Sequence, residues 1–238
     1  AKQHVNPWKL LVGFAHCCSV LWRDRLGQIS LAVTTLFWGA GATLQFIVLK
    51  WAEQILGLDL SRAAILQALV AVGIAGGAVY AAARVSLKQA MSVLPVGVAM
   101  GVIVALAAFY NRALVPSGEV QLAGMSVSYF LLVACAILVL IGALAGYFVV
   151  PMNALLQHRG HVLLSAGHSI AVQNFNENLS ILIMLGVYAL LIWLNLSIQT
   201  VMLLFGLFVA ISMLLVMLRH RANQRQFDSI SLIGESHH

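Results

Sequence analysis

The sequence feature that most constrains this chain is a series of long apolar runs, each of helix length. A helix needs about 20 apolar residues to cross a bilayer. Only 8% of the 238 residues are charged, whereas a soluble domain carries about 25%. The runs also lack the alternation of an outer-membrane barrel. We therefore predict an all-α integral membrane protein with six spans, at 29–50, 62–83, 91–110, 125–150, 168–193 and 198–219.

Two more polar segments flank the predicted bundle of residues 29–219. In residues 1–28, apolar side chains such as Trp8 recur at helical spacing among charged ones. We predict an amphipathic helix there, either in the membrane interface or as a connecting segment on the cytoplasmic face. Residues 220–238 form a basic tail. The chain has no signal peptide and does not begin with Met, so we expect a piece of a longer protein and give His237–His238 no functional weight.

The distribution of Lys and Arg predicts the orientation of the spans. Cytoplasmic segments are enriched in these residues, so the richer side is expected to be the cytoplasm and to hold both termini. An even number of spans agrees with this. The net charge of +6 also suits an anionic lipid surface better than nucleic acid. The richer side carries Lys2, Lys9, Arg23, Arg25, Arg84, Lys88, Arg159, Arg219, Arg221 and Arg225, and the other carries Lys50, Arg62 and Arg112.

The fifth span contains polar side chains where a span should be apolar. Counted from His168 at about 1.5 Å per residue, Glu177 lies roughly 14 Å deep, near the middle of a hydrocarbon core about 30 Å thick. A carboxylate there costs about 2.5–3.5 kcal/mol or more to insert and by default marks a functional site. Gln173, Asn174 and Asn178 share its helix face. We predict that these four residues bind substrate in a polar cavity; the alternative is a structural carboxylate held by neighbouring amides.

Three other polar positions have both a functional and a structural interpretation. Gln45 lies in the middle of the first span and either lines the cavity or joins two helices. Arg84 and Lys88 lie in a short predicted cytoplasmic loop and either set the topology or make a gating contact with a helix terminus. Lys50 is expected to anchor the opposite interface, because its long side chain can reach water.

The sequence carries no recognisable catalytic or metal site. His158, His161 and His168 lie in and beside a predicted loop without a nearby cysteine or carboxylate, so we expect no metal there. No nucleophile motif, Gly-rich phosphate loop or HExxH occurs. We therefore predict a protein that is not an enzyme and needs no cofactor. The three cysteines show no CxxC spacing and are expected to be free thiols.

Small residues predict how the spans pack. Glycines four residues apart let two helix backbones approach closely in lipid, and such pairs occur in three spans. Pro95 and Pro151 are expected near the cytoplasmic ends of their spans, where a break is tolerated. Six spans also allow two inverted three-helix repeats, although the sequence alone does not establish them. The glycine pairs are Gly73 with Gly77, Gly97 with Gly101, and Gly142 with Gly146.

Three stretches together resemble a known family. They are 36–44 (LFWGAGATL), 147–157 (YFVVPMNALLQ), and 171–174 (AVQN) followed by Glu177 and Asn178. They are similar to the C-terminal half of the bacterial lysophospholipid transporters, which belong to the major facilitator superfamily. The resemblance implies a twelve-helix transporter of which this chain carries helices seven to twelve as two inverted three-helix repeats. Its first 28 residues would connect the two halves.

The resemblance also implies a function and partners. The family moves lysophospholipids such as lysophosphatidylethanolamine from the outer to the inner leaflet of the bacterial inner membrane. A cytoplasmic acyltransferase–acyl-carrier-protein synthetase, sometimes on the same polypeptide, then reacylates them; no acyltransferase HxxxxD motif occurs here. Two positions depart from the relatives, because Gln45 replaces an arginine and Asn176 replaces a glycine. A phosphate-binding cation at the first position would therefore be lost or its role taken by another residue.

Three functional hypotheses follow. The first is half of a lysophospholipid flippase working by alternating access, in which Glu177 pairs with an ammonium head group or with a cation from the N-terminal six-helix half. The second is a major facilitator carrier of another amphipathic or small solute, coupled to protons through Glu177. The third is a membrane module without transport activity that docks an acyltransferase through its charged ends.

Overall fold

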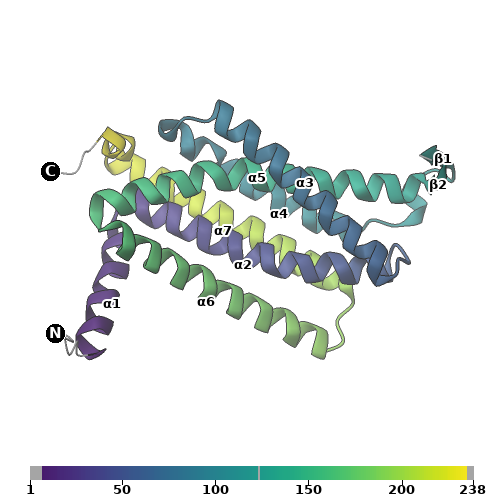
Figure 1. The fold of residues 1–238 in the computed structure, drawn as a ribbon, viewed down its shortest axis with the longest axis horizontal. Coiled ribbons are helices and arrows are strands. Elements are labelled where there is room, and N and C mark those ends of the chain that lie inside the picture. Colours follow the sequence, from purple (N-terminus) through teal and green to yellow (C-terminus); the bar gives the residue numbers. More distant parts are fainter. Residues whose placement is uncertain (1–6, 123, 235–238) are drawn as a thin grey trace.

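A computed structural model describes residues 7–122 and 124–234 of the chain. Within them, six helical segments are long and apolar enough to cross a membrane, and they pack as one bundle (Figure 1). The prediction of an all-α membrane protein is confirmed. The spans are α2 (Arg25–Gln54), α3 (Leu60–Arg84), the short η1 (Leu87–Val93) with α4 (Leu94–Ala107), α5 (Tyr129–Leu163), α6 (Ala166–Trp193) and α7 (Ile198–Gln226).

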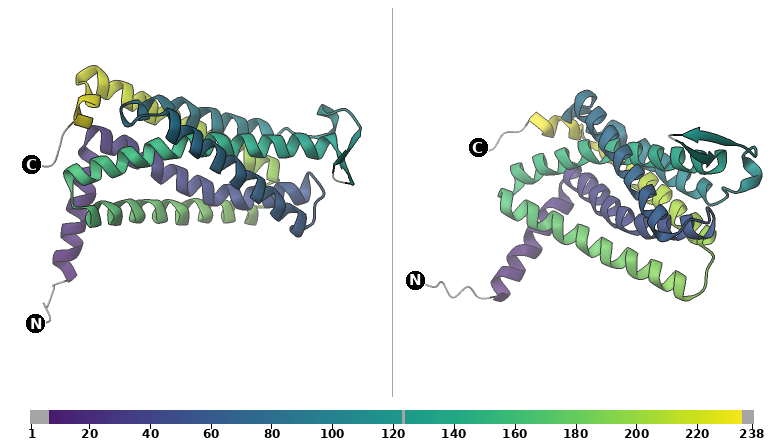
Figure 2. Two further views of the ribbon diagram at one scale, coloured as in Figure 1. Left: turned by 45° about the horizontal axis from the view of Figure 1, so that its top comes forward. Right: turned by 45° about the vertical axis from the view of Figure 1, so that its right-hand side comes forward.

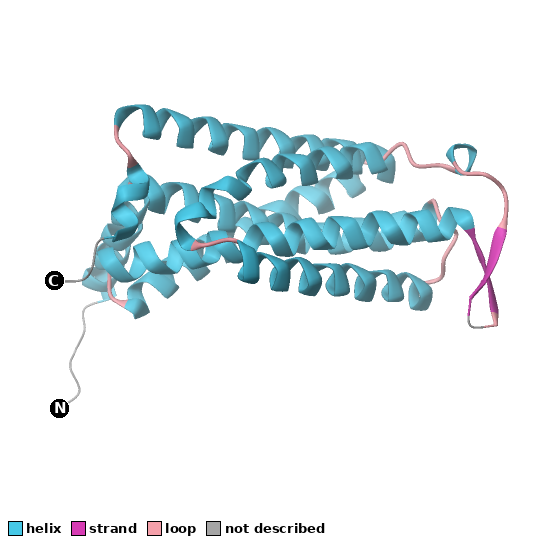
Figure 3. Cartoon of the chain, turned by 90° about the horizontal axis from the view of Figure 1, so that it is seen from above, coloured by secondary structure: helices cyan, strands magenta, loops and turns pink. Residues whose placement is uncertain are grey.

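The remaining elements lie at the two ends of the bundle. At one end, α1 (Pro7–Arg23) runs steeply across the direction of the spans, and η3 (Ser229–Gly234) follows α7 (Figure 2). At the other end, η2 (Arg112–Leu114) precedes an antiparallel hairpin of β1 (Glu119–Leu122) and β2 (Met125–Ser128), which projects beyond the helices (Figure 3). The Lys and Arg residues that the structure describes therefore lie toward the two ends of the bundle as the sequence predicts. Lys2 lies outside the described residues.

The fourth span differs from its predicted bounds of 125–150. Its first residues form β2, and the helix begins at Tyr129 because the Ser128 hydroxyl accepts a hydrogen bond from the backbone N–H of Leu131. The helix then continues through Pro151 to Leu163. The loop predicted around His158 is therefore wrong.

The physical reason is that the charge of Arg159, which follows Pro151, finds a partner inside the bundle. Arg159 is only 2% exposed and forms an ion pair, so this part of α5 does not need water to satisfy its charge. His158 and His161 also lie on α5, while His168 lies in the first turn of α6, where its Nδ1 is 2.6 Å from the Ser165 hydroxyl.

The predicted close packing of backbones is confirmed at five of the six glycines, whereas a Cβ at Gly97 would meet the side chains of Phe148 and Met213. A side chain at Gly73 or Gly77 of α3 would overlap with the backbone of α5, and one at Gly142 or Gly146 would overlap with the backbone of α3. In the same way, Gly101 of α4 meets the backbone of α7. These contacts set two helix pairs at backbone distance, which is how helices associate in lipid without a hydrophobic driving force.

The pairing of helices has the pattern that two three-helix repeats produce. With α2–α4 as one set and α5–α7 as the other, the second helix of each set packs on the first helix of the other set, and the two third helices pair. Corresponding helices run in opposite directions along the bundle, as inverted repeats require (Figure 1). The packing therefore supports the inverted arrangement that the sequence allowed.

Candidate functional site

The polar stretch of the fifth predicted span lies on α6, at the edge of the bundle (Figure 1). The helix begins where the Ser165 hydroxyl accepts a hydrogen bond from the backbone N–H of His168. In the most apolar 18-residue stretch of α6 only 6% of the residues are buried, compared with 50% in the corresponding stretch of the η1–α4 segment. A helix this exposed depends on lipid or on another protein surface to cover it.

Glu177 is the acidic residue of α6, and it turns into the bundle. Its side chain is buried, and the Gln173 amide donates a hydrogen bond to its Oε1 at 2.7 Å. The same nitrogen lies 3.3 Å from Oδ1 of Asn153 on α5, so one amide bridges two acceptors on neighbouring helices. Within the part of the chain that the structure describes, no ion pair reaches Glu177. The carboxylate is therefore held by an amide and not by a cation.

The four residues predicted to share one cavity face divide into two pairs. Gln173 and Glu177 turn toward α5, whereas Asn174 and Asn178 are exposed. The Asn178 amide donates to the backbone oxygen of Asn174 at 2.7 Å, which satisfies part of its hydrogen-bonding capacity. The polar surface of α6 thus continues from the interior of this chain to its outside.

Gln45 lines a cavity of about 410 Å³ between the spans. Its backbone oxygen accepts a hydrogen bond of 2.7 Å from the amide of Gln67 on α3, and both side chains line the cavity. The other lining residues are almost all apolar, including Trp38 and Ile181. Ile181 lies one helical turn after Glu177, so the cavity begins next to the carboxylate without including it.

Arg84 and Lys88 lie far from these residues, at the end of the bundle that carries the termini. Arg84 ends α3, and its guanidinium stands 5.9 Å from the centre of the Tyr80 ring. Lys88 lies in η1 and is exposed. The structure therefore does not bring the two predicted gating residues together with Glu177.

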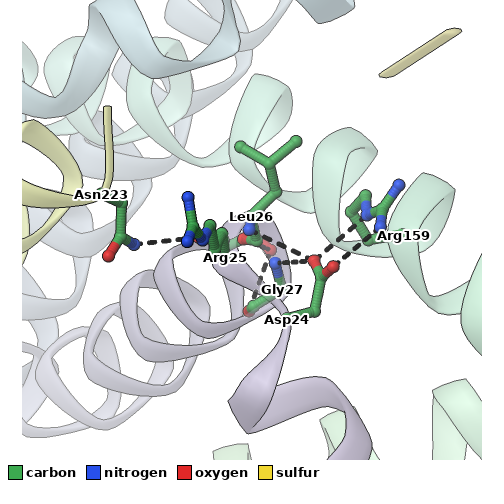
Figure 4. A network of polar contacts seen from close by, with 7 residues as sticks. Asp24, Arg25, Leu26, Gly27, Arg159 and Asn223 are labelled. Atoms are coloured by element: carbon green, nitrogen blue, oxygen red, sulfur yellow. Dashed lines mark hydrogen bonds and ion pairs between the residues drawn. The ribbon is translucent and has the colours of Figure 1, made fainter. Parts of the chain in front are cut away.

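A buried ion pair that the sequence did not indicate joins α5 to the start of α2 (Figure 4). Asp24 accepts hydrogen bonds from the backbone N–H groups of Leu26 and Gly27, and so caps α2. Its two oxygens also receive Nε of Arg159 at 3.1 Å and Nη2 at 2.7 Å. The Arg159 and Asp24 side chains are 2% and 10% exposed. Their separation by 135 residues left no signal in the sequence.

The first helix contacts the turn of α6 that carries Glu177. The Trp22 indole donates to Oδ1 of Asn176 at 3.3 Å, and the rings of Phe14 and Phe175 meet edge to face with centres 5.2 Å apart. Residues 175 and 176 directly precede Glu177, so the position of α1 and the position of the carboxylate are mechanically linked.

Comparison with known proteins gives one consistent set of relatives. No family model matches the chain, and no solved structure matches it. The protein named Lysophospholipid transporter LplT of Pectobacterium carotovorum subsp. carotovorum (strain PC1) is 40% identical over 194 residues, which is 81% of this chain and 43% of the relative.

Two further relatives with the same printed name are 38% identical over 211 residues, which is 87% of this chain and 49% of each relative. They come from Escherichia coli O1:K1 / APEC and Shigella boydii serotype 4 (strain Sb227). The chain therefore spans about half the length of the curated relatives it matches.

Proposed function

The chain belongs to the LplT family, and on this premise we propose that the full-length protein transports lysophospholipids across the bacterial inner membrane. This chain is its C-terminal six-helix half. The observation that carries the proposal is the 38–40% identity to proteins named lysophospholipid transporters over 81–87% of the chain. The buried carboxylate and amides of α5 and α6 supply a chemically suitable site.

The head group of a lysophospholipid matches the groups around Glu177. Lysophosphatidylethanolamine carries an ammonium, a phosphate and a free glycerol hydroxyl. The carboxylate of Glu177 pairs with the ammonium, while the amide nitrogen of Asn153 donates to an oxygen atom of the head group. A polar head group would otherwise meet only hydrocarbon at this depth, so each of these hydrogen bonds replaces one to water.

The exposed amides of α6 and the Gln45 cavity complete the substrate path against the N-terminal half. Asn174 and Asn178 face away from this chain, where a second six-helix half would cover them. Rocking of the two halves then exposes the site to one leaflet and afterwards to the other, as in other transporters built from repeats. Arg84 and Lys88 lie at the cytoplasmic end, where they set the topology or contact the other half.

The proposal includes an orientation and partners. Both ends of the chain lie in the cytoplasm, because the end of the bundle with α1 and α7 carries most of the cations. Residues 1–28 connect the halves along the inner membrane surface, and residues 220–238 form a basic tail. Lysolipid delivered to the inner leaflet is reacylated by a cytoplasmic acyltransferase–acyl-carrier-protein synthetase, separate or fused.

Uptake of lysophosphatidylethanolamine into cells that lack their own transporter tests the function and the site together. Glu177→Gln keeps the hydrogen bond from Gln173 but removes the charge, so we expect uptake to fall at least about tenfold at equal protein level. Glu119→Gln in the exposed hairpin is the matched control and should transport normally. Normal uptake by Glu177→Gln would remove Glu177 from the substrate site, and no uptake by the wild type would overturn the function.

One observation favours a second function, the proton-coupled carrier of another solute. Glu177 is buried with an amide and not a cation as its partner, so it can take up and release a proton as the site changes its exposure to water. This function predicts proton movement that depends on an added solute, is lost in Glu177→Gln and ignores lysolipids.

A further inference from the structure

A second hollow of the bundle lies between α6, α7 and α2, next to the Gln45 cavity, and Phe205 lines both. Its volume is about 360 Å³. The lining side chains recur at helical spacing on each helix. They include Ile183, Val187 and Leu191 on α6, Leu204 and Phe208 on α7, and Thr43 and Ile47 on α2. Helices α6 and α7 make few contacts with each other along this stretch, and several rim residues are exposed.

The hollow is lined almost entirely by apolar atoms. Thr43, its main polar residue besides Tyr188, already donates its hydroxyl hydrogen bond to the backbone oxygen of Gly39 at 2.9 Å. The Thr43 hydroxyl therefore needs no polar ligand, and Tyr188 is the other polar residue of the lining. An apolar occupant is favoured, and inside a bilayer the apolar groups available are acyl chains.

The length and position of the hollow match one leaflet. From Ile183 to Leu191 the helix rises about 12 Å, close to the half-thickness of roughly 15 Å of a hydrocarbon core. The hollow lies toward the end of the bundle that carries the hairpin, which the distribution of Lys and Arg makes the outer side. It is therefore the size of a single chain from the outer leaflet.

A cation stands at the outer mouth of the hollow. Thr43, Ile47 and Lys50 lie on one face of α2, so Lys50 continues the α2 wall toward the outer interface. The present partner of Lys50 is Glu53 at 3.0 Å, and with 40% and 63% of the two side chains exposed, this ion pair is weak enough to be exchanged.

From this arrangement we propose that the α2–α6–α7 hollow binds the acyl chain of a lysophospholipid arriving from the outer leaflet, with its phosphate at Lys50. The proposal rests on the proposed function and adds to it a first docking point, separate from Glu177. A diacyl lipid fits less well, because its second chain has no matching groove and stays in bulk lipid.

Photocrosslinking tests the groove without relying on transport. Full-length protein in vesicles is exposed to lysophosphatidylethanolamine with a photoreactive group on its acyl chain, and the adducts are mapped by mass spectrometry. We expect adducts on 183–191 and 201–208 that unlabelled lysophosphatidylethanolamine competes away and diacyl phosphatidylethanolamine does not. Adducts spread over the other lipid-facing positions, or equal competition by the diacyl lipid, would overturn the proposal.

Matched variants separate the two parts of the site. Leu204→Trp fills the groove and should weaken the competition by unlabelled lysophosphatidylethanolamine about tenfold, the equivalent of excluding two methylene groups. Leu214→Trp on the same helix is the control and should change this competition little. Lys50→Gln should weaken the competition by lysophosphatidylethanolamine about tenfold. The competition by monoacylglycerol, which has no phosphate, should not change. Equal effects of both tryptophans, or of Lys50→Gln on both ligands, would contradict the assignment.

These experiments also distinguish failure of the groove from failure of the proposed function. Uptake of lysolipid together with adducts outside the groove overturns the groove alone. Groove adducts without uptake by the wild type overturn the transport function and leave a lysolipid-binding site.

Discussion

Asp24 combines two structural roles in one carboxylate. It caps the first turn of α2 through Leu26 and Gly27, and it neutralises Arg159, which is almost fully buried in α5. A buried guanidinium without a counter-charge is costly, and removing one partner of such a pair typically destabilises a protein by about 3–5 kcal/mol. This single contact therefore ties the end of α1, the start of α2 and the end of α5 together.

Variants of the pair test this at the level of residues. Arg159→Met leaves Asp24 buried and unpaired, so we expect the melting temperature in detergent to fall strongly. Adding Asp24→Asn removes the orphaned charge while the asparagine keeps the cap, and the double variant should recover part of the loss. A double variant as unstable as Arg159→Met alone would mean that the charge is not what the arginine compensates.

The sequence identified single residues only where they contrast with their neighbours. Glu177 and Gln173 were found because polar groups are rare in apolar runs, and their mutual hydrogen bond follows from a spacing of four residues. Asn153, Asp24 and Arg159 were not found, because their roles depend on partners from distant parts of the chain. Asn153 did carry a signal, since it is an amide within a long apolar stretch.

At the scale of helices, the α3–α5 interface offers a direct comparison of two adjacent glycines. An added methyl group at Gly77 would overlap with the backbone of Ala143, whereas one at Gly76 meets nothing within 4 Å. Gly77→Ala should therefore separate the helices and destabilise by about 1–3 kcal/mol. Gly76→Ala should be neutral or stabilise by up to about 1 kcal/mol through helix propensity.

Unfolding of the two variants in mixed micelles by increasing denaturing detergent measures this difference. Equal stability of Gly76→Ala and Gly77→Ala would show that α3 and α5 do not touch at backbone distance.

The packing of α1 on the bundle can be followed through Cys18, which lies outside the spans. Burial raises the pKa of the Cys18 thiol above its ordinary value, and the neighbouring Cys17 adds to the shift. A raised pKa leaves less thiolate at a given pH, so Cys18 should be alkylated slowly at neutral pH and faster as the pH rises. The measurement uses full-length protein in which Cys18 is the only cysteine.

Loss of the contact between α1 and α6 should change this rate. Phe14→Ala removes the ring that meets Phe175, so Cys18 should become more exposed and react several-fold faster. Val12→Ala, on the exposed side of α1, should leave the rate unchanged. A rate that does not respond to Phe14→Ala would mean that α1 is held elsewhere.

Helices were predicted from the sequence more accurately than their ends. The apolar runs predicted six spans, and the glycine spacing predicted sites of close approach without identifying the partner helices, since span length and small-residue spacing are local properties. The hairpin before α5 was missed although its two strands pair locally with each other. The continuation of α5 past Pro151 was missed because the partner of Arg159, Asp24, lies in a distant segment. A short polar stretch is predicted as a loop when the partner of its charge is unknown. Here the partner of Arg159 is Asp24.

At the scale of the molecule, the exposed amides of α6 predict a water-accessible surface shared with the rest of the protein. Asn178→Cys in the full-length protein should react with a membrane-impermeant thiol reagent and, if the proposed function holds, be protected by lysolipid. Leu215→Cys on α7, which is 60% exposed as leucine, should face lipid and stay unreactive. Reaction of both positions, or of neither, would contradict a polar path along α6.

The sequence could not describe a complete site, because the chain is about half as long as its relatives. It indicated one polar face on α6, whereas the structure divides that face between an interior pair and an exposed pair. Which residue pairs turn inward depends on how α6 rotates against α5 and α2. That rotation is fixed by contacts such as Gly39 against Ser180, which no local pattern reveals.

The backbone-distance contacts of α3 with α5 and of α4 with α7 have a mechanical consequence. At these glycines no side chain separates the two helix backbones. Sliding one helix past the other would therefore break many contacts at once. These four helices should behave as a stiff block throughout a working cycle. Of the other three helices, α2 also packs on this block, whereas α1 and α6 make few contacts with it. We therefore expect α1 and α6 to move most within this half.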